Sequence, residues 1–247
     1  FQNKNVLLEK LSEVNGGEQI INFLNSDYHL RYIGIDDVEV FYAIRKIPLP
    51  KDKQITIVSA TADDYIYKKL NSGNFVDLGM AENVGNVVQF TNKMYSRNQI
   101  NKGSIPDVDD DSIVITYKTL KEMFNNADEI THFGNLTGFD HLKGKKIDVV
   151  GTPIPHPTQT LLYAKALGFD TPKNQEKIYR EMFLNGIKFS TYTYENDDLA
   201  NIETRIALME LEQAGGRART SITNSDVQIH STIPTLLADT YDGKKSN

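Results

Sequence analysis

A chain of 247 residues is long enough for one large domain, or for one domain and a piece of another. The lack of cysteine excludes disulfides and thiolate metal sites, and no apolar run approaches the roughly 20 residues of a membrane helix. A net charge of -6 argues against a sequence-blind nucleic-acid coat, which needs a broad basic face. We therefore expect a cytoplasmic protein with no membrane partner, and the start at Phe1 suggests a fragment.

The part of the chain before Ser112 mixes helical and extended patterns. Helical periodicity covers residues 5–25, with an interruption at Gly16 and Gly17, and a shorter helix is expected over 63–71. Extended runs predict short strands at 37–44, 54–59, 75–79 and 85–91. Residues 101–112 contain a proline and a group of acids, which predicts a loop.

From Ser112 onward the chain alternates between strand and helix patterns. Continuous β-branched runs predict buried strands at 112–120 and 147–153. Further strands are expected at 129–133, 187–194 and 226–232. Helices are expected at 118–127, 156–168, 171–186 and 197–216. This alternation predicts an α/β fold, a doubly wound parallel sheet flanked by helices, whose ligands bind at the carboxyl ends of the strands.

Three polar stretches are candidates for such a carboxyl-edge site. The first, "IVSATA", contains Ser59 and Thr61, whose hydroxyls suit the coupling of two domains or simply end a strand. The second is the glycine-rich loop 134–146 with Gly138 and Asp140, together with the "GTP" that ends the following strand. Ordinary turn chemistry explains each of its residues separately, but it explains less well a loop so rich in glycine directly after a buried strand.

The third stretch, "EQAGGRAR", follows the helix expected at 197–216. Its Gln213, Gly216, Arg217 and Arg219 permit two interpretations. Glycine and arginine are common at helix C-termini, where cations favour the negative end of the helix. Two arginines after two glycines also form a compact phosphate clamp, because guanidinium binds phosphate oxygens in a fork.

Other candidate sites are weaker. The acids at 107–111 lack the ligand spacing of a calcium loop, so a solvated loop is expected there. Tyr192 and Tyr194 suit base stacking but are more commonly strand packing. No metal site is expected from the five scattered histidines, His29, His132, His141, His156 and His230.

The order of these stretches resembles the later part of a superfamily 2 helicase. "SAT" resembles motif III, "SIVITYKTL" the start of motif IV, "THFGNLTGFD" motif V, and "EQAGGRAR" motif VI. The resemblance spans about residues 54–231. It implies a RecA-like helicase C-terminal domain at 62–247, preceded at 1–61 by a remnant of the first RecA-like domain.

Two departures from the family pattern limit what the chain can do alone. The chain has no G-x-x-x-x-G-K-[ST] loop and no acidic Walker B strand. We therefore expect ATP and Mg²⁺ to be held by a first RecA-like domain, in cis or in trans, and the chain alone to be inactive. The second motif VI arginine is also displaced, because Thr220 stands at its position and the arginine is Arg219. Either the turn shifts to accommodate it or Arg217 acts alone.

The resemblance also implies roles for individual residues. Arg217 would be the arginine finger, with Arg219 beside it and Gln213 orienting it. The nucleotide would be contacted by Gly138, Asp140 and Gly216. Ser59 and Thr61 would couple ATP hydrolysis to movement on the strand. Single-stranded or duplex DNA, or RNA, would be contacted by Thr116, Lys118, Gly151 and Thr152. Two alternatives stay open: a non-catalytic α/β interaction module derived from a helicase domain, and a nucleotide-binding α/β enzyme of another kind.

Overall fold

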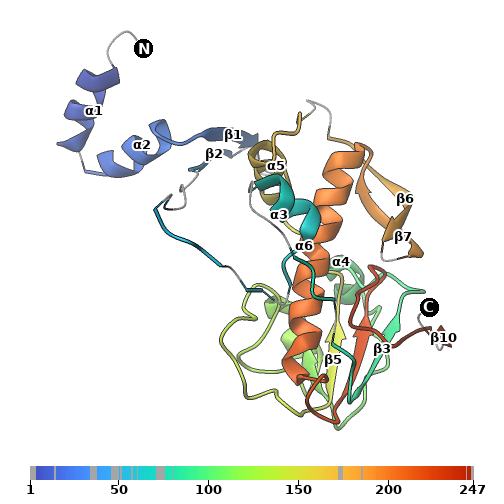
Figure 1. Ribbon diagram of the computed structural model, residues 1–247. Helices are drawn as coiled ribbons and strands as arrows, with labels where there is room; N and C mark the ends of the chain where they lie inside the picture. The colour runs from blue at the N-terminus through green and yellow to red at the C-terminus, as the bar shows by residue number, and fades with distance from the viewer. Residues whose placement is uncertain are drawn as a thin grey trace. The chain divides into compact units, whose positions relative to one another are not determined.

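The computed structural model (Figure 1) describes residues 4–13, 15–33, 38–45, 50, 52–56, 58–59, 61–70, 76–79, 81–171, 175–184, 186–242 and 244–245. The chain forms two compact units. One consists of Phe1–Val58 with His156–Lys173, and the other of Ser59–Pro155 with Asn174–Asn247. The segment 156–173, which the sequence pattern placed in the second domain, thus packs with the N-terminal residues.

The described residues of the first unit form three helices and one β-hairpin. Its elements are α1 (Lys4–Ser12), α2 (Gly17–Leu24), β1 (Tyr28–Ile33), β2 (Glu39–Ile44) and α5 (Pro157–Ala166). Gly16 has a φ of 83°, a left-handed conformation that suits glycine, and it divides the helix expected over 5–25 into α1 and α2. The strands pair antiparallel and α5 packs against both. The sequence predicted β2 but missed β1.

The second unit is built around a parallel sheet. Its elements are α3 (Asp64–Leu70), β3 (Asn86–Phe90), α4 (Arg97–Asn101), β4 (Ile113–Ile115), the 3-10 helix η1 (Lys118–Met123), β5 (Ile147–Val150), β6 (Lys177–Leu184), β7 (Ile187–Tyr194), α6 (Asp197–Gly215), the 3-10 helix η2 (Gly216–Ala218), β8 (Asp226–His230), β9 (Thr240–Tyr241) and β10 (Lys244–Lys245). The strand order is β10-β9-β3-β8-β5-β4, in which β10 is antiparallel to β9 and the other pairs are parallel. The predicted α/β class with a parallel sheet flanked by helices is confirmed.

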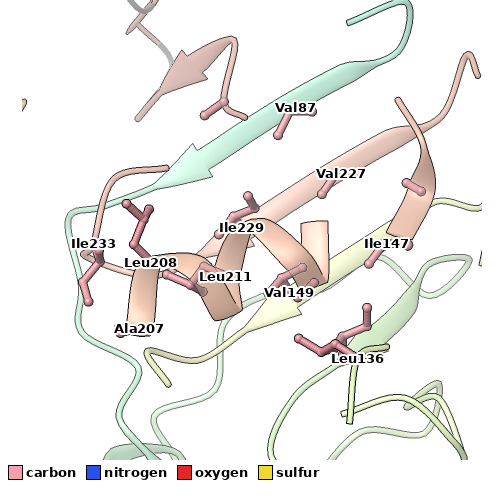
Figure 2. Packing of buried hydrophobic residues seen from close by; sticks show 14 of the residues in the cluster. Val87, Leu136, Ile147, Val149, Ala207, Leu208, Leu211, Val227, Ile229 and Ile233 are labelled. Atoms are coloured by element: carbon pink, nitrogen blue, oxygen red, sulfur yellow. The ribbon is translucent and has the colours of Figure 1, made fainter. Parts of the chain in front are cut away.

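Alternation along the strands gives the sheet two buried faces. Figure 2 shows the apolar side chains of α6 directed at one face, with Leu208 and Leu211 near Ile229 of β8 and Val149 of β5. The opposite face packs Val114 and Val150 against a cluster that includes Tyr95, Ile100, Leu120 and Phe124. Full burial of one such aliphatic side chain contributes about 1.5–3 kcal/mol, so α6 is fixed firmly on the sheet.

The expected helix at 171–186 is wrong. Residues 177–184 form β6, which pairs antiparallel with β7 through a turn at Gly186, where φ is 75°. Tyr179, Glu181 and Phe183 are exposed, whereas the residues between them are half-buried. Exposure therefore repeats every second residue, which is the period of a strand.

Several smaller expectations also differ from the structure. The strands expected at 54–59 and 75–79 are absent from the described residues of those ranges, which have no regular structure. Residues 126–133 run beside β4 with only scattered backbone bonds instead of forming a strand. The helix expected at 118–127 is the shorter η1.

Candidate functional site

The predicted site residues lie at opposite edges of the parallel sheet. The turn that carries Arg217 and Arg219 leads into β8, and the loop 134–146 leads into β5, so both lie at the amino edge. The two segments are adjacent, because the Gly144 N–H donates to the Ala218 carbonyl at 2.9 Å. The expectation of a common carboxyl-edge site is therefore wrong for these two stretches. Each chain segment must return to the amino edge before the next parallel strand begins.

The arginine turn has a fixed backbone. Arg219 is left-handed, with φ 60° and ψ 42°, and its carbonyl accepts from the N–H groups of Ile222 at 2.9 Å and Thr223 at 3.0 Å. Thr220 is buried, and its carbonyl accepts from the N–H groups of Val84 and Gly85 just before β3. The position of the second motif VI arginine thus holds a buried threonine that fastens the turn to the sheet.

Both arginines bind consecutive residues of the loop 134–146. Arg217 donates from Nη1 to the Phe139 carbonyl at 3.1 Å, and Arg219 donates from Nη2 to Asp140 Oδ1 at 3.1 Å. Gly138, just before them, has a φ of 82°. The structure therefore brings together Gly138 and Asp140 with Arg217 and Arg219, which are almost 80 positions away in the sequence.

Arg217 retains unused donor capacity. Its Nε is buried and has no hydrogen-bond partner among the described residues. Burial lowers the pKa of the guanidinium, and the neighbouring positive charge of Arg219 lowers it further. Arginine stays protonated in proteins, so the group remains a cation with a free N–H. A free N–H on a partly buried cation is suited to an anionic oxygen.

The surroundings of the turn bear on the helix-cap interpretation. Among the described residues, the guanidinium hydrogen bonds of both arginines go to the loop and not to the last carbonyls of α6. Gly215 packs on the core, since an added Cβ would lie 3.1 Å from Leu237 Cδ1. Gly216 has an ordinary φ of -64° and open space where a Cβ would be. Gln213 is half-buried on the same last turn.

The threonines expected to contact nucleic acid lie at the carboxyl edge, and both are buried. Thr116 donates from Oγ1 to the Val150 carbonyl at 2.8 Å, and Thr152 Oγ1 lies 3.0 Å from Ser231 Oγ. Gly151 has a φ of 135°, and an added Cβ would lie 2.7 Å from Cε2 of Tyr117. These three residues thus have structural tasks in the sheet, whereas Lys118 is exposed.

Two cations that follow β3 at the carboxyl edge were missed in the sequence. Lys93 and Arg97 are exposed, and each lies over an aromatic ring, Lys93 over Tyr95 at 5.4 Å and Arg97 over Tyr117 at 4.9 Å. Burial raises the pKa of Tyr117, so its hydroxyl stays protonated and donates to the Thr152 carbonyl. The alternation of basic and aromatic residues in "KMYSR" was the available signal.

Ser59 and Thr61 lie in an irregular segment just before α3. The Thr61 N–H donates to Ser59 Oγ over a long distance of 3.4 Å. The helix that follows is fastened to α6, because Arg205 pairs with Asp63 at 2.6 Å and its guanidinium lies 4.8 Å from the ring centre of Tyr65. A coupling role for the two hydroxyls stays a prediction.

The buried polar residues of the sheet do not form a nucleophile triad. Asp148 bonds both Ser112 and His230, with 3.0 Å to His230 Nε2. A triad needs the histidine next to the nucleophile, so that it can accept the hydroxyl proton. Here the carboxylate stands between the two, which gives Ser112 no imidazole base.

The described residues contain no group of three or more histidines or acids placed to hold a metal ion. Within the same part of the chain, no helix combines the length and apolar character needed to cross a bilayer.

The two tyrosines considered for base stacking lie differently. Tyr194 is buried against α6, whereas Tyr192 is exposed with its ring centre 5.0 Å from that of Tyr179.

Comparison with known proteins gave no relative. No family model matches the chain, and no curated protein or solved structure matches it either. The resemblance to helicases therefore rests on the motif residues of the sequence alone.

Proposed function

We propose that this chain is the C-terminal, RecA-like half of an ATP-dependent nucleic-acid helicase or translocase. One observation carries the proposal: Arg217 and Arg219, from the expected motif VI, contact the Gly138–Asp140 segment of the expected motif V. Two segments that the helicase pattern assigns to one nucleotide site thus share a surface.

The residues of this surface suit a phosphate and not a magnesium ion. Arg217 offers a partly buried cation whose Nε–H has no partner among the described residues, and the adjacent Gly216 has open space at its Cβ position. The γ-phosphate develops charge on its equatorial oxygens as it leaves, and a positioned guanidinium stabilises that charge. The chain has no phosphate-binding glycine loop, so we assign the ATP phosphates and Mg²⁺ to a first RecA-like domain, in cis or in trans.

The nucleic-acid strand belongs, in this proposal, at the carboxyl edge of the sheet. Lys93, Arg97 and Lys118 are exposed there, and Arg97 lies over the ring of Tyr117, the residue before Lys118. Cations that contact phosphates hold a strand without reading its bases. Three contacts require no broad basic face, which agrees with a net charge of -6.

The test measures ATP hydrolysis with and without single-stranded DNA, for the protein combined with a domain that carries the phosphate-binding loop. We expect Arg217→Ala to lower kcat at least about 100-fold while ATP still binds, because the finger acts on the transition state. Lys188→Ala, which removes an exposed cation from the β6–β7 hairpin, is the matched control and should keep wild-type kcat.

Two results would contradict the proposed helicase function in different ways. Unchanged kcat in Arg217→Ala would make the turn a helix terminus without a role in chemistry. Hydrolysis that is absent from every combination, together with stable binding of a protein partner, would favour the non-catalytic interaction module.

A further inference from the structure

The ion pair between Arg219 and Asp140 occupies a guanidinium that the proposed function needs for phosphate. Asp140 Oδ1 lies 3.1 Å from Arg219 Nη2, and the two side chains are 79% and 47% exposed. A carboxylate presents two anionic oxygens to guanidinium in the same way as a phosphate does. We propose that Asp140 is an internal counter-ion, which competes with an incoming phosphate for Arg219.

The backbone on both sides of Asp140 is held independently of this ion pair. The Phe139 carbonyl is bonded to Arg217, and the Asp140 carbonyl accepts from the Lys143 N–H at 3.1 Å. Farther back, the Gly134 N–H donates to the carboxylate of Glu210 on α6. A phosphate therefore displaces only the Asp140 side chain, by rotation about its own bonds, and the loop keeps its place.

The two arginines consequently have different tasks. Arg217 has a carbonyl partner, which carries no net charge, so no bound anion has to leave it when a phosphate approaches. Arg219 must exchange one anion for another. Its left-handed backbone and the buried Thr220 after it fix where the side chain begins, directly beside Asp140.

The ion pair between Asp140 and Arg219 is weak, and an exchangeable contact must be weak. Exposed ion pairs contribute little, and salt screens them. Exchange of Asp140 for a phosphate carrying more charge is thus possible at low ionic strength, and removal of the carboxylate should strengthen phosphate binding by a small factor. This inference rests on the turn being the phosphate site of the proposed function, but not on ATP hydrolysis.

The experiment titrates inorganic pyrophosphate into the protein by calorimetry at low ionic strength. We expect Asp140→Asn to raise the association constant about two- to fivefold, the range that an exposed ion pair accounts for. Asp110→Asn makes the same change in net charge at an exposed acid in the 101–112 loop, and should change the constant less than the Asp140 substitution does. Thermal unfolding of each variant confirms that it is folded.

A double substitution isolates the pair. In an Arg219→Ala background the gain from Asp140→Asn should disappear, because no guanidinium remains to be released. A fall in affinity in Asp140→Asn, no change, or a gain that persists without Arg219 would each overturn the proposal. A fall would point instead to Asp140 as a direct ligand.

Failure of this proposal can be told apart from failure of the proposed function. If Arg217→Ala abolishes pyrophosphate binding but Asp140→Asn gives no gain, only the counter-ion is wrong. If Arg217→Ala leaves pyrophosphate binding unchanged, the turn is not a phosphate site and both proposals fail.

Discussion

The two ends of helix α6 hold their charged side chains in different ways. Near its start, Glu203 is fully buried, and its carboxylate bonds Lys177 Nζ at 2.6 Å and the Thr193 hydroxyl at 2.7 Å. Just past its end, Arg219 is exposed in a pair with Asp140, and Arg217 keeps an N–H without a partner. The satisfied, buried group fastens the β6–β7 hairpin, whereas the exposed Arg219–Asp140 pair can rearrange around a ligand. Spare hydrogen-bonding capacity, more than charge, therefore distinguishes a candidate site from an anchor.

The largest expected effect is at the buried end. Glu203→Ala leaves Lys177 without its anion in a mostly buried position, and breaking a buried pair in this way costs about 3–5 kcal/mol. Urea unfolding should show a lower midpoint with an unchanged slope. Removing both charges, as Glu203→Leu with Lys177→Met, should recover most of the loss. A Glu203→Ala variant as stable as the wild type would mean that the pair is not an anchor.

Glu212, one turn before the arginines, is an intermediate case with a pH dependence. Burial raises the pKa of its carboxyl to about 7, although the Leu236 N–H donates to Oε1 at 3.1 Å and opposes the rise. A carboxyl with a raised folded-state pKa takes up a proton that the unfolded chain has lost. Stability therefore falls as the pH rises from the unfolded value of 4.5 to about 7, and is level above it.

Glu212→Gln keeps the acceptor oxygen and removes the titration. The variant should match the wild type near pH 4 and exceed it above pH 7, by on the order of 1–2 kcal/mol because water reaches part of the side chain. The free energy of unfolding, measured from pH 4 to pH 8, checks this. Parallel pH profiles for the two proteins would contradict the raised pKa.

The sequence predicted those parts of the fold in which local pattern and tertiary context agree. The buried strands β5 and β8 are continuous apolar or β-branched runs, and α6 begins with acids and ends at glycine, so each was found. β6 was missed because "KIYREMFL" contains strong helix formers, and its period of two becomes visible only when α6 covers one face. Hairpin pairing outweighed local helix propensity there.

The sequence selected two segments that the structure brings side by side, but it placed them at the wrong edge of the sheet. The resemblance to helicase motifs selected Gly138, Asp140, Arg217 and Arg219; in the structure Arg219 bonds Asp140 and Arg217 bonds the carbonyl of Phe139, which lies between Gly138 and Asp140. The prediction that these two segments lie at the carboxyl edge was wrong, because the sequence pattern of single strands does not show where a long connection comes back to the amino edge. Arg97 was missed for a related reason: its position over the ring of Tyr117 depends on the fold.

The smallest expected change in stability is at Gly216, and it separates the two interpretations of the arginine turn. Gly216 has a helical φ of -64° and open space at the Cβ position, so Gly216→Ala should fold normally and gain roughly 0.4–1 kcal/mol from the stiffer unfolded chain. If the turn only ends a helix, that gain is the whole effect. If the open space admits a phosphate beside Arg217, the added methyl should weaken pyrophosphate binding while thermal stability rises.

Gly215→Ala is the matched control, because its methyl meets Leu237 in the core, away from the open side of the turn. This substitution should lower stability without a specific effect on the anion. A Gly216→Ala protein that is more stable and binds pyrophosphate as the wild type does would restrict the anion to the Arg219 side, where only exchange with Asp140 makes room for it.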